Sequence, residues 1–126
     1  MLGKEKAFSS FSTDDIDKAQ DFYQNTLALK ITKDEMGILW LDLNGADVII
    51  YPKEETHQPA SFTVLNFNVD NLEETVKKLK EKGVEFEHYD RPKTDDDNIS
   101  RSENGHKVAW FKDPAGNILS VMTSIE

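Results

Sequence analysis

The chain has 126 residues, of which 37% are hydrophobic and 10% aromatic, enough for one compact domain with a substantial core. It carries 24 Asp and Glu against 15 Lys and Arg, and this net charge of −9 argues against nucleic-acid binding through a basic patch. The absence of cysteine excludes disulfides, thiolate catalysis and zinc–thiolate sites.

The sequence also lacks the apolar segments that bring a chain to a membrane. No run approaches the roughly 18 apolar residues that span a bilayer, and residues 1–6 carry charge without the apolar region of a secretory signal. We therefore expect a cytoplasmic protein with no membrane partner. The acidic surface would attract cationic small molecules, although keeping the chain in solution is its simpler role.

A strand, a helix and three further strands are predicted in the first half. Thr13-Asp14-Asp15 supplies a helix N-cap and two acidic side chains for the positive end of the helix dipole. Apolar residues follow at helical spacing from Ile16 to Leu27. Asn44-Gly45 is typical of a hairpin turn between two strands. The expected strands are 6–12, 29–32, 38–43 and 47–51.

The same order of elements is predicted again after a linker over about residues 53–60, which shows neither helical nor strand periodicity. Asp70-Asn71 caps the second helix, Gly83 ends it, and Lys77–Lys82 forms its solvated basic side. Residues 89–104 form a polar loop whose length is typical of lids or disordered segments. The expected strands are 61–69, 84–88, 106–112 and 117–123, the last two joined by the turn 113–117.

The two halves therefore repeat one plan. The segment Phe11–Ile16 is echoed 56 residues later by Phe67–Leu72, and Trp40 is echoed 70 residues later by Trp110. Such a repeat indicates two modules within a single domain that spans the chain. One helix protects only one face of a four-stranded sheet, so the other face must meet the twin module, a second chain or a ligand. The expected modules are residues 6–52 and 61–124 of the domain 1–126.

Three motifs resemble the vicinal oxygen chelate superfamily, which includes glyoxalase I, extradiol dioxygenases and the bleomycin resistance proteins. They read Asp15-Ile-x-x-Ala-x-x-Phe-Tyr23, Val69-Asp-Asn-Leu72 and Phe111-x-Asp-Pro-x-Gly-Asn117, and they lie in both halves. The resemblance implies an α+β fold in which two tandem βαβββ modules form a curled mixed sheet around a shared cup. It also implies that two chains pair into a homodimer.

In the metal enzymes of that superfamily, a histidine on the first strand and a carboxylate on the last strand of each module bind a divalent ion. Counted from the motifs, these positions fall on Phe8, Val64, Ile49 or Ile50, and Ser120. Hydrocarbon side chains cannot replace the water around a cation, and a lone serine is a poor ligand. The resemblance therefore predicts a mostly apolar cup with no metal and no cofactor, which removes the Lewis-acid mechanism of glyoxalase I.

Aromatic and amide side chains are the expected means of holding a small molecule in this cup. Trp40, Trp110 and Phe8 either line it as a stacking surface or belong to the core. Asn66 shares a strand face with Val64, and its amide either orients a ligand through hydrogen bonds or meets water at the strand edge.

Charged and titratable side chains offer weaker candidates. His57 and His88 are expected to be surface residues, while His106, at a junction of loop and strand, is also a candidate general acid or base. Asp95–Asp97 lacks the glycine and the final glutamate of a calcium loop and is interpreted as a solvated acidic segment. Arg101, near the end of the long loop, either meets an anionic ligand or pairs with surface carboxylates.

Three hypotheses about function remain open. The first is a protein that binds a small apolar or aromatic molecule in a metal-free cup, and the second is a lyase or dioxygenase-type enzyme with an unusual or absent metal site. The third is a closed module that associates with another protein. For the first hypothesis the expected ligand-binding residues are Phe8, Trp40, Ile49, Val64, Asn66, His106, Trp110 and Ser120.

Overall fold

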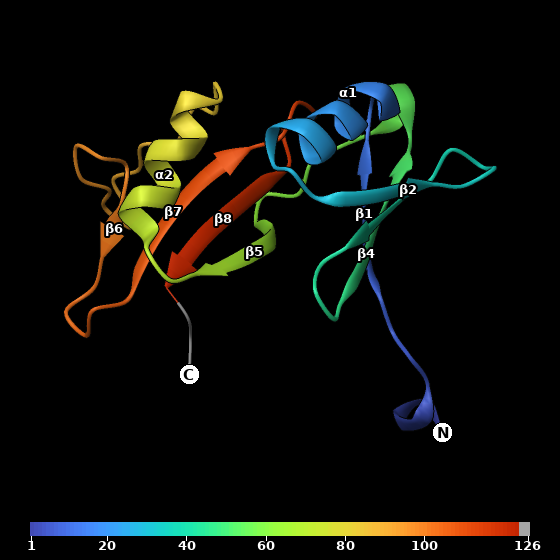
Figure 1. Ribbon diagram of the computed structural model, residues 1–126, viewed down its shortest axis with the longest axis horizontal. Coiled ribbons are helices and arrows are strands. Elements are labelled where there is room, and N and C mark those ends of the chain that lie inside the picture. The colour runs from blue at the N-terminus through green and yellow to red at the C-terminus, as the bar shows by residue number, and fades with distance from the viewer. Residues whose placement is uncertain (124–126) are drawn as a thin grey trace. The chain divides into compact units, whose positions relative to one another are not determined.

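The computed structural model describes residues 1–123, which form two compact units that divide between residues 58 and 59. Each unit contains one four-stranded mixed sheet and at least one helix (Figure 1). Within residues 1–123, no helix combines the length and the apolar character needed to cross a bilayer.

The first unit has the predicted order of a strand, a helical segment and three strands. Its sheet has the order β1-β4-β3-β2, with β1 parallel to β4 and the other neighbours antiparallel. The helical segment begins as an α-helix and ends as a π-helical turn. The elements are η1 Leu2–Lys4, β1 Ser9–Thr13, α1 Ile16–Asp21, η2 Phe22–Thr26, β2 Lys30–Lys33, β3 Leu39–Asp42, β4 Asp47–Pro52 and η3 Glu54–Thr56.

One face of this sheet is covered by α1 and η2. The Asp15 side chain begins α1 by accepting hydrogen bonds from the backbone N–H groups of Asp17 and Lys18, each at 3.1 Å. Tyr23 of η2 is fully buried, and its ring lies 6.1 Å from that of Phe11, centroid to centroid. Because side chains alternate along a strand, the residues beside Phe11 in sequence belong to the opposite, open face.

The second unit repeats this arrangement, with the sheet order β5-β8-β7-β6 and β5 parallel to β8. The Asn71 side chain caps α2 by accepting from the N–H of Glu74, and Leu72 and Val76 are buried where α2 packs on β7 and β8. Gly83 follows the helix with a φ of +93°, as expected for a helix end. The elements are β5 Thr63–Val69, α2 Leu72–Glu81, β6 Ser100–Arg101, β7 Lys107–Lys112 and β8 Ile118–Thr123.

The predicted strand 84–88 is wrong. Only Phe86 pairs with the sheet, through a single bridge to Phe111, and the two rings lie 5.4 Å apart. The fourth strand is instead β6, which comes from the segment predicted to be a polar loop. That segment is anchored by Thr94 and Ile99, which are 2% and 1% exposed, so it packs against the unit as part of its core.

The turn between β7 and β8 follows the prediction closely. The Asp113 carboxylate accepts hydrogen bonds from the backbone N–H groups of Ala115 and Asn117 and from the Asn117 side chain, each at 2.9 Å. Gly116 adopts a φ of +86°, which favours glycine. Asp113 and Asn117 are both buried, so this turn is a structural part of the unit.

Candidate functional site

The open face of the second sheet carries one continuous row of predicted site residues. Ser120 of β8 pairs with Asn66 of β5 on one side and with Trp110 of β7 on the other. Directly paired residues lie on the same face, so all three side chains project from the side opposite α2. Ser120 is fully buried, and its hydroxyl donates a hydrogen bond to Oδ1 of Asn66 at 2.5 Å.

An aromatic residue that the sequence analysis did not single out extends this row. The rings of Tyr89 and Trp110 lie 5.3 Å apart in an edge-to-face arrangement. The segment that leads to Tyr89 is tied to β7, because the backbone N–H of Glu87 donates to the carbonyl of Trp110 at 2.8 Å. Burial raises the pKa of the Tyr89 phenol, and the nearby negative charge of Glu87 raises it further, so the phenol stays protonated and can donate a hydrogen bond. We call Asn66, Ser120, Trp110 and Tyr89 the second-sheet row.

Val64 lies where the pairing of this sheet is irregular. The pairing of β5 with β8 shifts between Thr63 and Leu65, so Val64 falls at an irregularity in the ladder. The alternation that was expected to place Val64 on the face of Asn66 is therefore interrupted at this residue.

His106 lies apart from the second-sheet row. It precedes β7 and is four residues from Trp110, which corresponds to ~13 Å along a strand. Its backbone N–H donates to Asn104, and its carbonyl accepts from Ser102. The side chain is half-buried, and within the part of the chain that the structure describes, its Nε2 atom has no hydrogen-bond partner.

The open face of the first sheet carries the other predicted aromatic residues. Ile49 pairs with both Ser10 and Trp40, so these three lie on the open face, whereas Ile50 is fully buried on the helix side. Of the two isoleucines that the sequence left open, Ile49 is thus the one on the predicted face. The Phe8 ring lies 5.4 Å from that of Trp40, and these side chains are 56% and 36% exposed.

Trp40 is fixed in this position by Asp34. The indole N–H donates to Oδ2 of Asp34 at 3.0 Å, and this hydrogen bond, with others from the backbone N–H groups of Ile38 and Met36, lowers the pKa of the Asp34 carboxyl. We call Phe8, Trp40 and Ile49 the first-sheet aromatic surface.

His57 is not the unengaged surface residue that the sequence suggested. Its Nδ1 atom lies 2.7 Å from the hydroxyl oxygen of Ser12, and both side chains are half-buried. Ser12 pairs with Tyr51 in the ladder between β1 and β4, one row beyond the pair of Ser10 and Ile49.

The positions that the resemblance assigns to metal ligands keep their apolar or hydroxyl character in the structure. Phe8 and Ile49 belong to the first-sheet aromatic surface, and Ser120 already donates to Asn66. Across residues 1–123, no three side chains of His, Asp or Glu gather as a group that would hold a metal ion.

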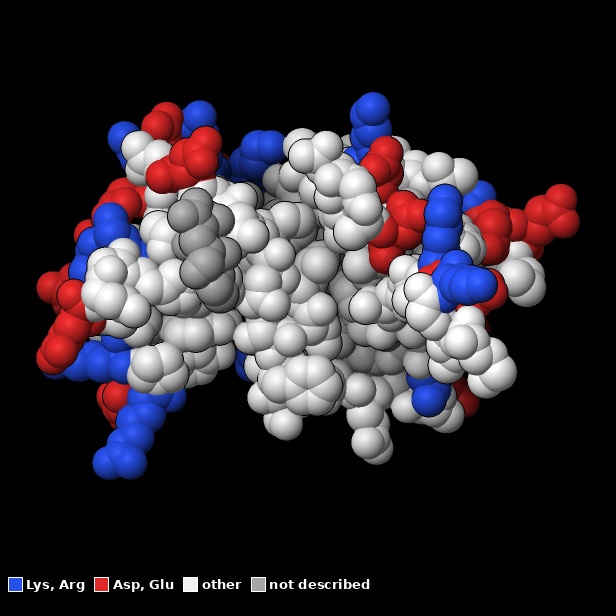
Figure 2. Space-filling view, turned by 90° about the horizontal axis from the view of Figure 1, so that it is seen from below, with Lys and Arg blue, Asp and Glu red and all other residues white. Residues whose placement is uncertain are grey.

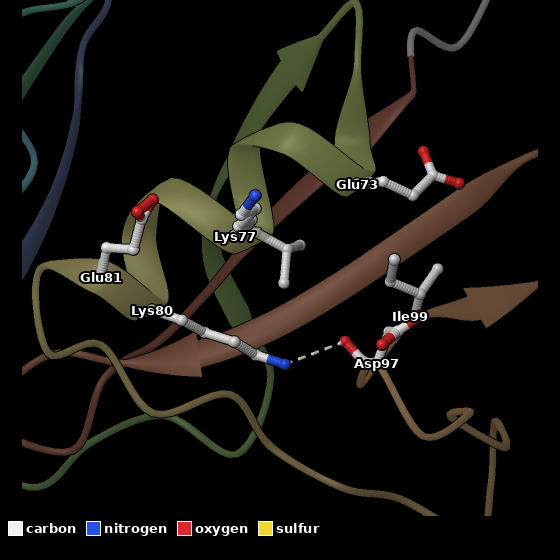
Figure 3. Close-up of a pocket in the computed structure, with 7 residues that line it drawn as sticks. Glu73, Lys77, Lys80, Glu81, Asp97 and Ile99 are labelled. Carbon is white, nitrogen blue, oxygen red and sulfur yellow. Dashed lines mark hydrogen bonds between the residues drawn. The ribbon is translucent and has the colours of Figure 1, made fainter.

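A pocket of about 480 Å³ lies on the helix side of the second unit, between α2 and the segment 97–99 (Figure 3). The Lys80 ammonium donates to Oδ1 of Asn98 at 2.9 Å and to the carbonyl of Asp97 at 3.4 Å. Its walls mix charged side chains of both signs with the buried residues Val76 and Ile99. Lys80 therefore fastens this segment to α2, and the pocket does not involve the predicted site residues.

The carboxylate of Glu73, at one end of this pocket, joins α2 to the two neighbouring strands. It accepts from Lys107 at 2.9 Å and from Arg101 at 3.0 Å, and these two cations hold the pKa of Glu73 down to about 2. Arg101 also contacts Asp95 at 2.7 Å, so it pairs with two carboxylates. This pairing supports the surface-pairing interpretation of Arg101 over the anion-binding one.

A family model and solved structures are similar to this chain over most of its length. Residues 9–121 match the model of the Glyoxalase/Bleomycin resistance protein/Dioxygenase superfamily. A superfamily member from Sphaerobacter thermophilus is similar in structure with a TM-score of 0.74 and 25% identity, covering 98% of this chain and 100% of that one. Lactoylglutathione lyase from Agrobacterium tumefaciens gives a TM-score of 0.71 at 17% identity, covering 95% and 94%, a likeness of fold alone.

Proposed function

The chain belongs to the Glyoxalase/Bleomycin resistance protein/Dioxygenase superfamily, and we propose that within it the protein binds a small aromatic molecule without a metal ion. The family and the α+β fold of two tandem modules, both predicted from the sequence, are confirmed. A cup shared by the two sheets stays a prediction.

The second-sheet row is the observation that carries this proposal. Trp110 and Tyr89 offer aromatic surface, and the amide of Asn66 keeps its N–H groups for another acceptor because the Ser120 hydroxyl donates to its oxygen. A few fixed polar groups within an aromatic and apolar surface are typical of small-molecule sites. The ligand that fits this chemistry is a planar aromatic compound that bears a hydrogen-bond acceptor.

The charge of the surface narrows the choice of ligand. The chain carries a net charge of −9, so it attracts cationic compounds more readily than anionic ones. In Figure 2, Asp and Glu side chains stand beside Lys and Arg side chains, and many of the other visible side chains are uncharged. Neutral or cationic aromatic compounds are therefore the first class to test.

A metal-independent site is proposed because of the side chains at the positions that bind metal in related enzymes. Phe8 and Ile49 have no donor atoms, and the Ser120 hydroxyl is engaged by Asn66. A divalent ion needs several nitrogen or oxygen donors to replace its hydration shell.

The experiment is a thermal-shift screen of neutral and cationic aromatic compounds, run in parallel with and without EDTA. A ligand that binds the folded protein raises the melting temperature by mass action, and the proposal requires that this rise is the same with the chelator. Loss of the rise in EDTA would instead point to a metal-dependent site.

The alternative is a lyase or dioxygenase-type enzyme with an unusual or absent metal site. The observation in its favour is family membership, together with the structural likeness to a lactoylglutathione lyase. Turnover of the glutathione hemithioacetal of methylglyoxal, or of a catechol, would support it. The assay is run with added zinc, nickel, manganese or iron(II), and again with EDTA.

We also propose that two chains form a homodimer. Large apolar side chains that remain exposed support this, since Phe62 is 68% and Phe8 56% accessible in the single chain. Light scattering coupled to size-exclusion chromatography measures the mass directly, and a monomeric mass at micromolar concentration would contradict the proposal.

A further inference from the structure

We propose that Ser12 and His57 form a nucleophile and general-base pair that takes an acyl group from small esters. The pair lies on the first unit, and its chemistry does not depend on whether the second-sheet row binds a ligand. The distance between Ser12 Oγ and His57 Nδ1 is 2.7 Å, although the residues are 45 positions apart in the sequence. This is the separation at which an imidazole activates a serine hydroxyl.

The imidazole is held in place by the turn η3. The backbone N–H of His57 donates to the carbonyl of Glu54 at 3.1 Å, and both the N–H and the hydroxyl of Thr56 donate to the carbonyl of Lys53. The N–H of Lys53 in turn donates to the carbonyl of Thr13 at 2.9 Å. The turn that carries the base is therefore tied to the residue next to the nucleophile, which fixes the separation of the pair.

The surroundings of Ser12 indicate the kind of substrate. The serine lies on the open face of β1, and the next row of that face contains Ser10, Ile49 and Trp40. Alternate residues of a strand are about 7 Å apart, so an acyl or aryl group of a few carbon atoms reaches this row. The chemistry fits a small uncharged ester with an apolar leaving group.

The reaction needs no co-reactant besides water. Ser12 Oγ attacks the ester carbonyl carbon while its proton passes to His57 Nδ1. The bond between the carbonyl carbon and the alcohol oxygen then breaks, and His57 donates the proton to the leaving alcohol. Water then attacks the carbonyl carbon of the acyl-serine and gives a proton to His57 Nδ1. His57 donates that proton to Ser12 Oγ as the carboxylic acid departs. The reactive tautomer of His57 has its proton on Nε2.

The test treats the full-length protein with p-nitrophenyl acetate and, separately, with an alkyl fluorophosphonate, followed by peptide mapping. We expect one acyl or phosphonyl group on the peptide that contains Ser12. Ser12→Ala should abolish it, and His57→Gln should slow the labelling by at least ~100-fold, the range of general-base catalysis. Ser10→Ala is the matched control because Ser10 lies on the same strand and face, and it should label like the wild-type protein.

Three results would overturn the proposal: no label on the folded wild-type protein, label that persists in Ser12→Ala, or a His57→Gln variant that reacts at the wild-type rate. Thermal melts of each variant establish that it is folded. Peptide mapping of the wild-type protein identifies the acylated residue even if a variant does not fold.

Discussion

The hydroxyl of Ser120 donates a 2.5 Å hydrogen bond to the amide oxygen of Asn66 on the neighbouring parallel strand, 54 residues earlier in the chain. This contact joins the first and last strands of the second module on the face opposite its helix. It also determines which hydrogen bonds Asn66 offers a ligand, because its amide oxygen accepts from Ser120 and its side-chain N–H groups are donors.

The first prediction concerns the stability of this contact. Asn66→Ala leaves the fully buried Ser120 hydroxyl without its acceptor, so it should lower the free energy of unfolding by about 1–3 kcal/mol. Asn68→Ala, on the same exposed side of β5, is the control and should have a smaller effect. Urea denaturation measures both, and equal effects would show that the hydrogen bond contributes little.

A second prediction concerns the aromatic surface. If a ligand stacks on Trp110, Trp110→Ala should weaken its binding by about 1–3 kcal/mol, as expected for a large aromatic contact. Trp40→Ala removes the same kind of ring from the other unit, where the indole donates to Asp34, and should cost less affinity than Trp110→Ala. Isothermal titration calorimetry compares the two variants. An affinity that depends on Trp40 alone would move the site to the first-sheet aromatic surface.

The third prediction follows from the lowered pKa of Glu73. In the folded protein this pKa is about 2, against an ordinary value of 4.5, mainly because of Lys107 and then Arg101. The ion pairs of Glu73 therefore contribute fully to the free energy of unfolding above pH 4.5. This contribution is lost as the pH falls from 4.5 towards 2. Since all three side chains are partly exposed, high salt should weaken the effect.

Glu73→Gln should remove this part of the pH dependence of the melting temperature. Glu74→Gln is the matched control because Glu74 lies in the same first turn of α2 and forms an exposed pair with Lys78. Melting curves of the wild-type protein, Glu73→Gln and Glu74→Gln are compared between pH 2 and pH 6. This range includes the folded-state pKa of Glu73, about 2, and its ordinary value of 4.5. Identical curves for the two variants would show that Glu73 contributes no more than Glu74 to the pH dependence of the melting temperature.

The fourth prediction separates backbone strain from contact at two glycines. Gly83 and Gly116 both have positive φ angles, +93° and +86°, so alanine at either position should cost about 1–2 kcal/mol of stability. At Gly116 a new Cβ would also lie 3.3 Å from Cγ of Pro59, whereas at Gly83 it would meet nothing within 4 Å. Gly116→Ala should therefore lower the free energy of unfolding by about 1 kcal/mol more than Gly83→Ala does, as measured by chemical denaturation.

Much of the fold could be predicted from the sequence because the decisive signals are local. Asn71 caps the start of α2 and Gly83 follows its end, close to where the sequence predicts both. Asp113 and Gly116 form the turn that their residue types predict. The strand predicted over 84–88 failed because its apolar residues pack on the sheet through one bridge at Phe86 without continuing the ladder.

The candidate site was less accessible to sequence reasoning. The sequence named Ser120 and Trp110 separately, and only the observed pairing of β7 with β8 puts them side by side on one face. The register of β4 then selects Ile49 over Ile50, which the sequence left open. The contact of Tyr89 with Trp110 depends on how the long loop returns to the sheet, which no local pattern states. The pairing of Ser12 with His57 was missed for the same reason, since the two residues are 45 positions apart.

The most direct test of the central claim uses the two tryptophans of the chain, Trp40 and Trp110. Trp40→Phe leaves Trp110 as the only indole, and Trp110→Phe leaves Trp40. Each variant is titrated, in EDTA, with the compounds that raise the melting temperature, while tryptophan emission is recorded. We expect saturable quenching or a spectral shift in the Trp40→Phe protein, and a weaker response in the Trp110→Phe protein. A response confined to Trp40, or one that appears only after a divalent metal replaces the chelator, would contradict it.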